Sequence, residues 1–417
     1  MKKTQEHPLY YWEEKSYMMV IPPHEEDNLL SEALSNIGSM EETKIIENNY
    51  DVENKCIHLK IDYEGDFYDI GLFEGGISVP EYYLNSPFFK DDEKEKILKA
   101  KKAITIFMPF LNEPKKSYHL QLKLCVAMVP NLIGLLDESA EKMLSSHWVK
   151  MAANSKVLPS SKNLFSVQGV IGDDDKVWLH THGLCRCGLT ELEILDSDMK
   201  NQQNHYNLLN TYAMYLVDRK EKTDPRGKGS YIGRLINGYP VVVTCIPWIE
   251  GLKEYKRIDL GGPKDRQEGH NSQTSIVFLY KSEKDENKRK LSKISDYDEL
   301  WGDNPLFFFS DEETDRMKAL AREQFDYVKK ASKDKDNTIL LKIGLPLQEE
   351  GKYEHIWFEL LEIKGEKFKA KLTQEPYYFN NIHAGYEAWY QKDDITDWII
   401  YTESSSITPD TAFLLDK

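Results

Sequence analysis

Residues 176–194 concentrate more reactive side chains than any other stretch of the chain. Within nineteen residues they include two histidines, two cysteines and two glutamates: His180, His182, Cys185, Cys187, Glu191 and Glu193. Because alternate residues of a β-strand project to the same face, a strand here would bring the imidazoles of His180 and His182 side by side. Two imidazoles and a carboxylate form a ligand set for zinc or another borderline divalent metal.

One hypothesis is therefore a metal site formed by His180, His182 and Glu193, with the glutamate on the following strand. A metal ion held there would activate water, which makes a metal-dependent hydrolase the catalytic alternative for this chain. His-x-His is short and common, however, and no spacing in the sequence fixes a third ligand. We favour the interpretation in which the histidines are hydrogen-bonded structural groups on a half-buried strand and the glutamates form a solvated face.

Other catalytic patterns are weaker still. Cys185 and Cys187 could ligate a metal with one histidine, but four ligands within eight residues would strain a single tetrahedral site. The sequence has no Cys-x-x-Cys motif, no Gly-x-Ser-x-Gly elbow and no phosphate-binding Gly-x-x-x-x-Gly-Lys-Ser loop. The run Arg-Gly-Lys-Gly-Ser at residues 226–230 could bind an anion at a helix beginning near Tyr231, but we favour a flexible turn there.

The composition predicts a folded, acidic chain. Its 417 residues, 40% of them hydrophobic, are enough for about two or three domains. A net charge of −16 argues against nucleic acid and against anionic membranes as partners. Five cysteines are too few for a disulfide framework, and no apolar run follows the first lysines as in a signal peptide. No segment has the length and apolarity of a membrane span, so we expect the cytoplasm.

Regular elements around residues 176–194 decide where the reactive side chains lie. Residues 164–171 and 177–182 are predicted to form a hairpin across an acidic turn. Residues 202–217 have the apolar stripe of a helix, and residues 241–248 form the nearly continuous apolar run of a buried strand. Upstream, residues 117–136 are predicted to be a helix. The histidines should therefore lie on a strand inside a sheet.

The mixture of strands and helices predicts the α+β class. We expect a mixed α/β N-terminal region with antiparallel sheets and a small β-rich, partial barrel-like C-terminal domain. The predicted domains are an α+β N-terminal domain at residues 1–160, an α+β central domain with the His-x-His strand at residues 161–285, and a C-terminal domain at residues 310–417. The last begins with a helix, because Ser310 is a good N-cap with Glu313 three residues on.

Aromatic residues are unusually frequent in the C-terminal domain. Trp357, Trp389, Asp397 and Trp398 are the candidate binding residues, because tryptophan buries a large area in an interface at low entropy cost. The alternative, which the residue types favour on their own, is core packing in a small β domain with a tryptophan anchoring the final strand.

Five short runs in this domain carry a family resemblance: Glu354-His355-Ile356-Trp357, residues 365–372, Glu375-Pro376, Gly385, and Ile395-Thr396-Asp397-Trp398. On these runs the last quarter of the chain resembles a bacterial domain of unknown function that includes the YegJ-type proteins. The first three quarters look like the uncharacterised bacterial proteins that carry this domain at their C-terminus. The resemblance implies a cytosolic bacterial protein, and it brings no activity and no catalytic residues.

We therefore expect a non-catalytic interaction protein of a stress-related or immunity type, in which the acidic surface and the aromatic domain recognise a protein partner. An acidic chain with no complete catalytic constellation argues more for binding than for turnover. On this interpretation the protein needs no cofactor. The alternative remains a metal-dependent hydrolase that uses His180 and His182 with zinc or another divalent metal.

Overall fold

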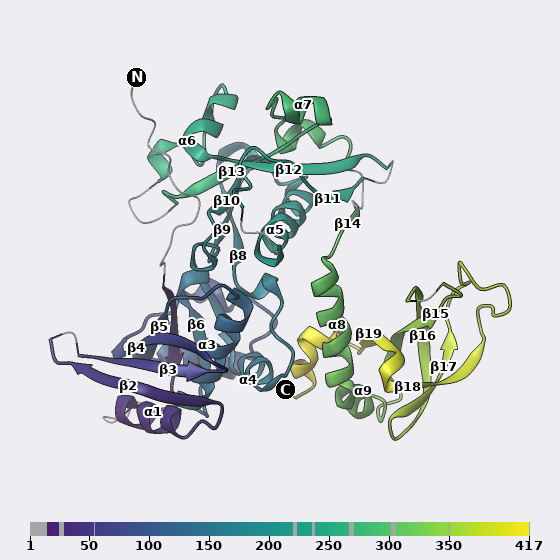
Figure 1. Ribbon diagram of the computed structural model, residues 1–417, viewed down its shortest axis with the longest axis horizontal. Helices are drawn as coiled ribbons and strands as arrows, with labels where there is room; N and C mark the ends of the chain where they lie inside the picture. The colour runs from purple at the N-terminus through teal and green to yellow at the C-terminus, as the bar shows by residue number, and fades with distance from the viewer. Residues whose placement is uncertain are drawn as a thin grey trace. The chain divides into compact units, whose positions relative to one another are not determined.

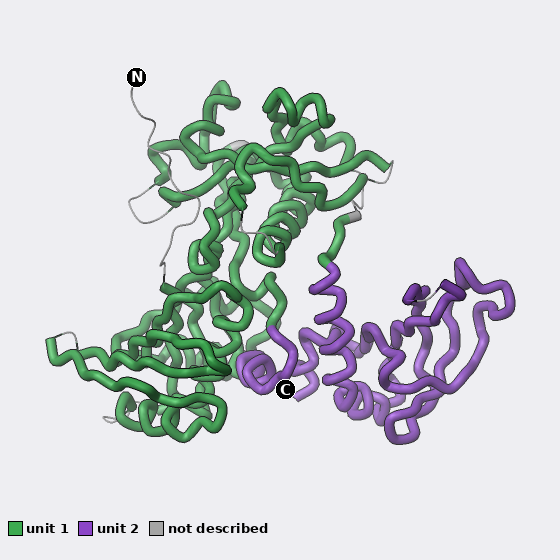
Figure 2. The backbone as a smooth tube through the Cα atoms, viewed as in Figure 1, with its two compact units in different colours: residues 1–146, 159–310 green, residues 147–158, 311–417 purple. Residues whose placement is uncertain are grey.

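The computed structural model describes residues 15–24, 29–53, 55–219, 223–235, 238–266, 271–301, 306–349 and 351–416. The chain divides into two compact units, one formed by residues 1–146 and 159–310 and the other by residues 147–158 and 311–417 (Figure 2). Helices and strands occur throughout, and the strands form three antiparallel or mixed sheets (Figure 1). The predicted α+β class is therefore confirmed.

The first sheet has seven strands in the order β2-β3-β4-β5-β1-β6-β7, with antiparallel neighbours. These strands are β1 (Ser16–Ile21), β2 (Thr43–Asp51), β3 (Cys56–Tyr63), β4 (Asp66–Gly76), β5 (Lys102–Met108), β6 (Gly134–Asp137) and β7 (Lys142–Ser145). The strand period turns Met18, Ile70 and Ile106 to one face, where they are fully buried. Helices α1 (Leu29–Gly38) and α3 (Pro114–Met128) contact the sheet and each other. We call the opposite face of this sheet its outer face.

The second sheet belongs to the same unit and has the order β14-β11-β12-β13-β10-β9-β8. Its strands are β8 (Ser166–Ile171), β9 (Lys176–His182), β10 (Glu191–Asp198), β11 (Ser230–Arg234), β12 (Pro240–Pro247), β13 (Thr274–Leu279) and β14 (Leu306–Phe307). Strands β10 and β13 run parallel. Helix α5 (Gln202–Asp218) contacts β10, so the predicted hairpin, helix and buried strand of this region are confirmed.

The predicted helix over residues 117–136 is wrong in its second half. Helix α3 ends at Met128, and Leu135 and Leu136 lie in β6, which pairs with both β1 and β7. The two leucines are buried by these pairings with strands distant in sequence, so tertiary contacts override the local helical pattern. This strand also brings Asp137 into the core of the first unit.

The second unit holds an antiparallel sheet of six strands in the order β18-β17-β16-β15-β19-β20. These strands are β15 (Thr338–Pro346), β16 (Tyr353–Lys364), β17 (Lys367–Leu372), β18 (Glu387–Gln391), β19 (Ile395–Tyr401) and β20 (Ser406–Ile407). Helices α8 (Asp311–Glu323) and α9 (Phe325–Ala331) supply Ala321 and Phe325 to its core. Within residues 338–407, β18 and β20 stay at opposite ends, so the sheet is open rather than closed as a barrel.

The remaining helices are short: α2 (Asp91–Lys99), α4 (Ser146–Asn154), α6 (Trp248–Gly251) and α7 (Glu283–Asn287). Most of α4 belongs to the second unit, where Met151 packs against the core. Helix α2 buries Ile97 against Ile21 and Leu136 at the β6 end of the outer face. In the part of the chain that is described, no helix combines the length and apolar character needed to cross a bilayer.

Candidate functional site

The two histidines lie on β9 as the strand period predicts. The rings of His180 and His182 stand edge to face with centroids 4.8 Å apart, and both residues are buried. The Trp178 ring lies 4.6 Å from His180 on the other side. The imidazoles are therefore part of an aromatic row along a buried strand.

Glu193 lies opposite His180 on β10, and its carboxylate accepts hydrogen bonds from three other side chains. One oxygen accepts a hydrogen bond from the Trp178 indole at 2.9 Å, and the other accepts bonds from Arg266 and Thr274, both at 2.8 Å. Burial raises the pKa of Glu193, against the opposing effect of the Arg266 guanidinium. The glutamate thus anchors β9, β10 and β13 to one another.

Glu191 also accepts three hydrogen bonds within the fold. Its carboxylate accepts bonds from the backbone amides of Gly183 and Cys185, at 2.8 and 3.1 Å, and from the Thr181 hydroxyl at 2.5 Å. It closes the turn that follows β9, where Gly183 has a left-handed φ of 107°. Glu191 and Glu193 are both buried, so the interpretation of these glutamates as a solvated face is wrong.

Among the residues that the structure describes, no group of three or more histidines, cysteines and acids lies where it could hold a metal ion. The carboxylate that His182 does meet comes from Glu141, whose Oε1 lies 3.3 Å from Nδ1 of the ring. Sequence reasoning missed Glu141 because it lies in the loop before β7, far from His182 in the chain. The metal site at His180, His182 and Glu193 remains a prediction.

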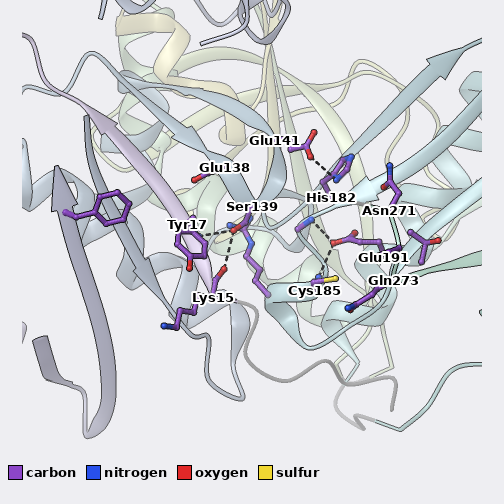
Figure 3. A pocket seen from close by; sticks show the side chains of 15 residues that line it. Lys15, Tyr17, Glu138, Ser139, Glu141, His182, Cys185, Glu191, Asn271 and Gln273 are labelled. Atoms are coloured by element: carbon purple, nitrogen blue, oxygen red, sulfur yellow. Dashed lines mark hydrogen bonds and ion pairs between the residues drawn. The ribbon is translucent and has the colours of Figure 1, made fainter. Parts of the chain in front are cut away.

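A pocket of about 460 Å³ opens beside this histidine and glutamate pair (Figure 3). It is lined from both sheets of the first unit by Lys15, Tyr17, Phe73, Glu138, Ser139, Glu141, His182, Gly183, Cys185, Arg186, Glu191, Asn271, Ser272, Gln273 and Thr274. Figure 3 shows Lys15 and Tyr17 on one side of it and His182 and Glu191 on the other. The lining is mixed, with carboxylates, hydroxyls, amides and two cations around the rings of Tyr17, Phe73 and His182.

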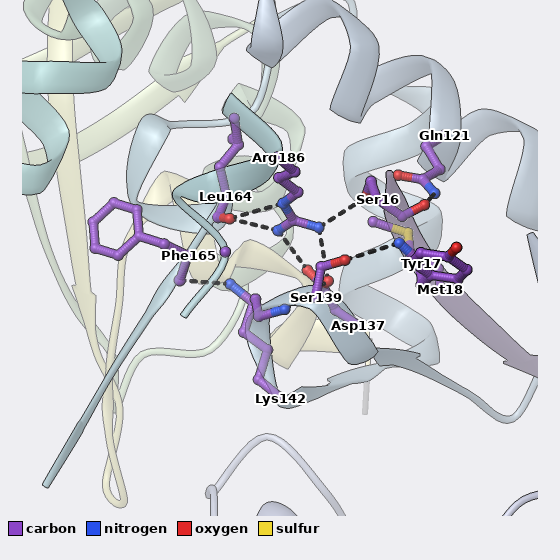
Figure 4. A network of polar contacts seen from close by, with 12 residues as sticks. Ser16, Tyr17, Met18, Gln121, Asp137, Ser139, Lys142, Leu164, Phe165 and Arg186 are labelled. Atoms are coloured by element: carbon purple, nitrogen blue, oxygen red, sulfur yellow. Dashed lines mark hydrogen bonds and ion pairs between the residues drawn. The ribbon is translucent and has the colours of Figure 1, made fainter. Parts of the chain in front are cut away.

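Arg186, which lines this pocket, belongs to a buried ion pair (Figure 4). Arg186, in the turn after β9, donates two parallel bonds to Asp137 of β6 at 2.7 and 2.9 Å. Its remaining donors reach the Ser16 hydroxyl and the Leu164 carbonyl. Beside it, Lys142 donates to the carbonyls of residues 163 and 165, and burial lowers the pKa of Lys142 to about 8. No local motif marks these partners, since they are distant in sequence.

A serine, a histidine and an aspartate also meet in the second sheet. The His205 ring lies 2.9 Å from the Ser197 hydroxyl and 2.8 Å from the Asp298 carboxylate. Ser197 and His205 are fully buried, whereas the Asp298 side chain is partly exposed. A nucleophile must reach its substrate, so this trio stabilises the contact of α5 with β10 and is unsuited to acyl transfer.

The glycine-rich run at residues 226–230 leads into a strand, because Tyr231 belongs to β11, and the predicted helix is wrong. The backbone amide of Gly229 donates to the Glu286 carboxylate at 2.7 Å. An acidic side chain of the protein therefore occupies the amide that an external anion would need.

The four candidate binding residues of the C-terminal domain divide between the two faces of its sheet. Trp357 lies opposite Lys342, which in turn lies opposite Asp397, so these three form one row across β16, β15 and β19. Trp389 lies opposite Lys369 on the same face. Trp398 points the other way, is fully buried, and donates its indole N–H to the carbonyl of residue 321. The face that carries Trp357 and Trp389 is called the tryptophan face below.

Family comparisons match three parts of the chain. Residues 16–159 match "Protein of unknown function (DUF4026) N-terminal", and residues 167–278 match "Protein of unknown function (DUF4026) C-terminal". These two matches together span more than half of the chain. The chain belongs to the DUF4026 family. Residues 311–413 match "Uncharacterized protein conserved in bacteria (DUF2314)", which confirms the resemblance of the last quarter to a bacterial domain of unknown function.

No curated protein and no solved structure matches the chain. The two DUF4026 parts both contribute to the central pocket, with Tyr17 and Glu141 from the first and His182 and Glu191 from the second. The tryptophan face lies wholly within the DUF2314 match.

Proposed function

We propose that the chain is a non-catalytic binding protein that contacts a protein partner through the tryptophan face of its C-terminal domain. One observation carries the proposal: Trp357 and Trp389 stand on the side of the sheet away from its own core. Trp389 is 43% exposed, although the domain has a well-packed hydrophobic core on the other side of its sheet. Large rings in this position are the usual anchors of protein interfaces.

The neighbours of the two rings hold them in place before any partner arrives. The Lys342 ammonium lies 5.5 Å from the Trp357 ring, and the Lys364 ammonium lies 4.8 Å from the Trp389 ring. Between the rings, Lys371 pairs with Glu359 at 2.7 Å. A surface organised in this way loses little conformational entropy on binding, which favours affinity.

The charges of this face are paired with one another, so the face is close to neutral. Lys369 pairs with Glu387 at 2.7 Å, next to the Lys371 and Glu359 pair. Half-buried Leu340 lies opposite Glu359 in the register and adds apolar area. Aromatic and apolar groups with a rim of paired charges suit a protein surface better than a polyanion.

The reactive groups of the first unit support the non-catalytic part of the proposal. Glu191 and Glu193 are bound into the sheet by three donors each, and Ser197 has no access to solvent. Groups that hold the fold in this way are poor general bases, because a proton transfer would break the bonds that position them. The stress or immunity setting expected from the sequence is the biological context that we propose for the partner.

The test begins with crosslinking in cells that express the natural protein, followed by purification of the captured partner. Calorimetry then compares its affinity for the full chain and for the Trp357→Ala, Trp389→Ala double variant. Loss of two anchoring rings should weaken binding by at least about thirtyfold, which corresponds to a hot-spot energy of about 2 kcal/mol. The matched control is Tyr50→Ala, an aromatic residue that is 57% exposed on the first unit.

Equal affinity of the double variant and the natural protein would remove the tryptophan face from the interface. An equal loss in Tyr50→Ala would also contradict the proposal, because it would indicate a contact outside the C-terminal domain. Circular dichroism of both variants shows whether the fold is kept, since neither ring lies in a core.

A further inference from the structure

A row of side chains crosses the outer face of the first sheet over five strands. In register, Asn49 of β2 lies opposite His58 of β3, which lies opposite Gly71 of β4. Gly71 lies opposite Phe107 of β5, and Phe107 lies opposite Tyr17 of β1. The core that contains Met18, Ile70 and Ile106 lies on the opposite side, where α1 and α3 contact the sheet, and the cluster around Ile97 lies at the β6 end of the outer face. The row therefore faces away from the core under α1 and α3.

Phe107 is the centre of this row because Gly71 makes room for it. A Cβ atom at Gly71 would lie 1.9 Å from the Phe107 ring, so the ring occupies the space that any larger residue would need. Tyr17 stacks on Phe107 with centroids 5.4 Å apart, and His58 and Phe73 approach it at 6.2 Å. Rings from β1, β3 and β4 thus surround a phenyl ring on β5.

A cation already sits on this ring cluster. The Lys15 ammonium lies 4.8 Å from the Phe107 centroid, within the range of a cation–π contact. Within the described ranges, no carboxylate lies within 4.0 Å of that ammonium. The negative π face of Phe107 thus accepts a positive group from the chain itself.

Two cavities open on either side of Lys15, and both are of a size suited to small organic ligands. One is the pocket of about 460 Å³ described above, with Glu138 and Glu141 in its lining. The other has about 430 Å³ and is lined by Glu47, Asp69 and Lys60 beside Phe107. Each cavity therefore offers a ring of the cluster together with carboxylates.

We propose that the ring cluster of Tyr17, His58, Phe73 and Phe107 is a binding site for a small organic cation with an ammonium or quaternary ammonium group. Lys15 is the internal occupant of this site, and the ligand displaces its side chain from Phe107. Once the Lys15 ammonium is displaced, carboxylates outnumber cations in both linings, with Glu138, Glu141 and Glu191 against Arg186 in one cavity and Glu47 and Asp69 against Lys60 in the other. This balance adds long-range attraction for a positive charge. This site is independent of the tryptophan face and of the partner proposed for it.

The contribution of the ring to binding follows from the strength of cation–π contacts. Such contacts change an affinity by roughly two- to thirtyfold, depending on how far water is excluded. Removing the Lys15 ammonium frees the ring and removes a like charge, so Lys15→Ala should bind a quaternary ammonium more tightly by a factor in this range. Lys15→Arg keeps a cation over the ring and should bind it no better than the natural protein.

The experiment titrates the full chain with choline and, separately, with its neutral carbon isostere, in which a tert-butyl group replaces the trimethylammonium. Binding is followed by calorimetry and by nuclear magnetic resonance of the ligand methyl groups. We expect Lys15→Ala to bind choline more tightly than the isostere, and Phe107→Leu in the same background to lose most of that preference. The matched control is Phe67→Leu, because Phe67 is an exposed phenylalanine on β4 outside the cluster.

Three results would overturn the proposal: no saturable choline binding by Lys15→Ala, equal affinity for choline and its isostere, or an unchanged preference in the Phe107→Leu variant. If Phe107→Leu fails to fold, Tyr17→Leu replaces it, since that change removes a stacked ring and leaves the Gly71 contact intact. An unchanged preference in Tyr17→Leu would then count against the cluster.

Discussion

Replacing Asp137 with alanine should destabilise the first unit by about 3–5 kcal/mol, because it leaves the Arg186 guanidinium buried without its charge partner. The side chains of Arg186 and Asp137 are 1% and 0% exposed, so water cannot take the place of the carboxylate. The two bonds lost are charge-assisted and short, at 2.7 and 2.9 Å. Bonds of this kind contribute about 1.5–3 kcal/mol each, which leads to a similar total.

Removing both charges together should cost less than removing one. In the Asp137→Leu, Arg186→Met double variant no buried charge is left uncompensated, and apolar groups of similar volume fill the space. The Ser16 hydroxyl and the Leu164 carbonyl still lose their donor, so we expect a loss of about 1–2 kcal/mol rather than none. The double variant should therefore be more stable than the Asp137→Ala single variant, although it carries more substitutions.

Native-state hydrogen exchange of amides in β1 and β6 is the assay, because it reports the opening of the first unit without interference from the second. Glu95→Ala removes an exposed pair with Lys99 on α2 and should leave these amides unchanged. A loss below about 1 kcal/mol in Asp137→Ala, or a double variant less stable than the single one, would refute the role assigned to the pair.

Three further predictions concern the same unit. The fold lowers the pKa of Lys142 to about 8, so the unfolded state binds more protons at this lysine between pH 8 and the ordinary lysine pKa. The free energy of unfolding of the natural protein should therefore gain roughly 2 kcal/mol relative to Lys142→Met when urea unfolding is compared at pH 7 and pH 9.5. Gly183→Ala should lower the free energy of unfolding by about 1–3 kcal/mol in the same assay, because the φ of Gly183 is 107° and a Cβ there would lie 2.6 Å from a backbone carbonyl oxygen. The control is Gly65→Ala, which should cost less because Gly65 has a φ of 86° and open space around it. Metal analysis of the purified protein should find no stoichiometric zinc, iron or manganese; metal that is present and lost in the His180→Ala, His182→Ala variant would support the hydrolase alternative instead.

Local patterns were sufficient for the elements that position the reactive segment. The acidic turn between β8 and β9 and the apolar stripe of α5 depend only on neighbours in sequence, and the hairpin and the helix both form where predicted. The error at residues 129–136 has the opposite origin, since β6 forms only because β1 and β7 lie on its two sides. Local propensity contains no information about such partners.

Two of the polar contacts that line or adjoin the pocket join residues distant in sequence. Glu141 meets His182, and Arg186 meets Asp137, across tens of residues and between two sheets. For Asp397 and Trp398, however, a signal was present in the sequence. Adjacent residues of a strand face opposite sides, so no more than one of the two could belong to a face that meets a partner.

The Arg186 and Asp137 pair also has a consequence for how the chain can be divided. A cut near residue 160 separates the two DUF4026 matches, yet it leaves a carboxylate in one fragment and the guanidinium that neutralises it in the other. One fragment would then expose the Asp137 carboxylate and the other the Arg186 guanidinium, and both groups are buried in the intact unit. Shortened versions for expression should therefore keep both matches in one polypeptide.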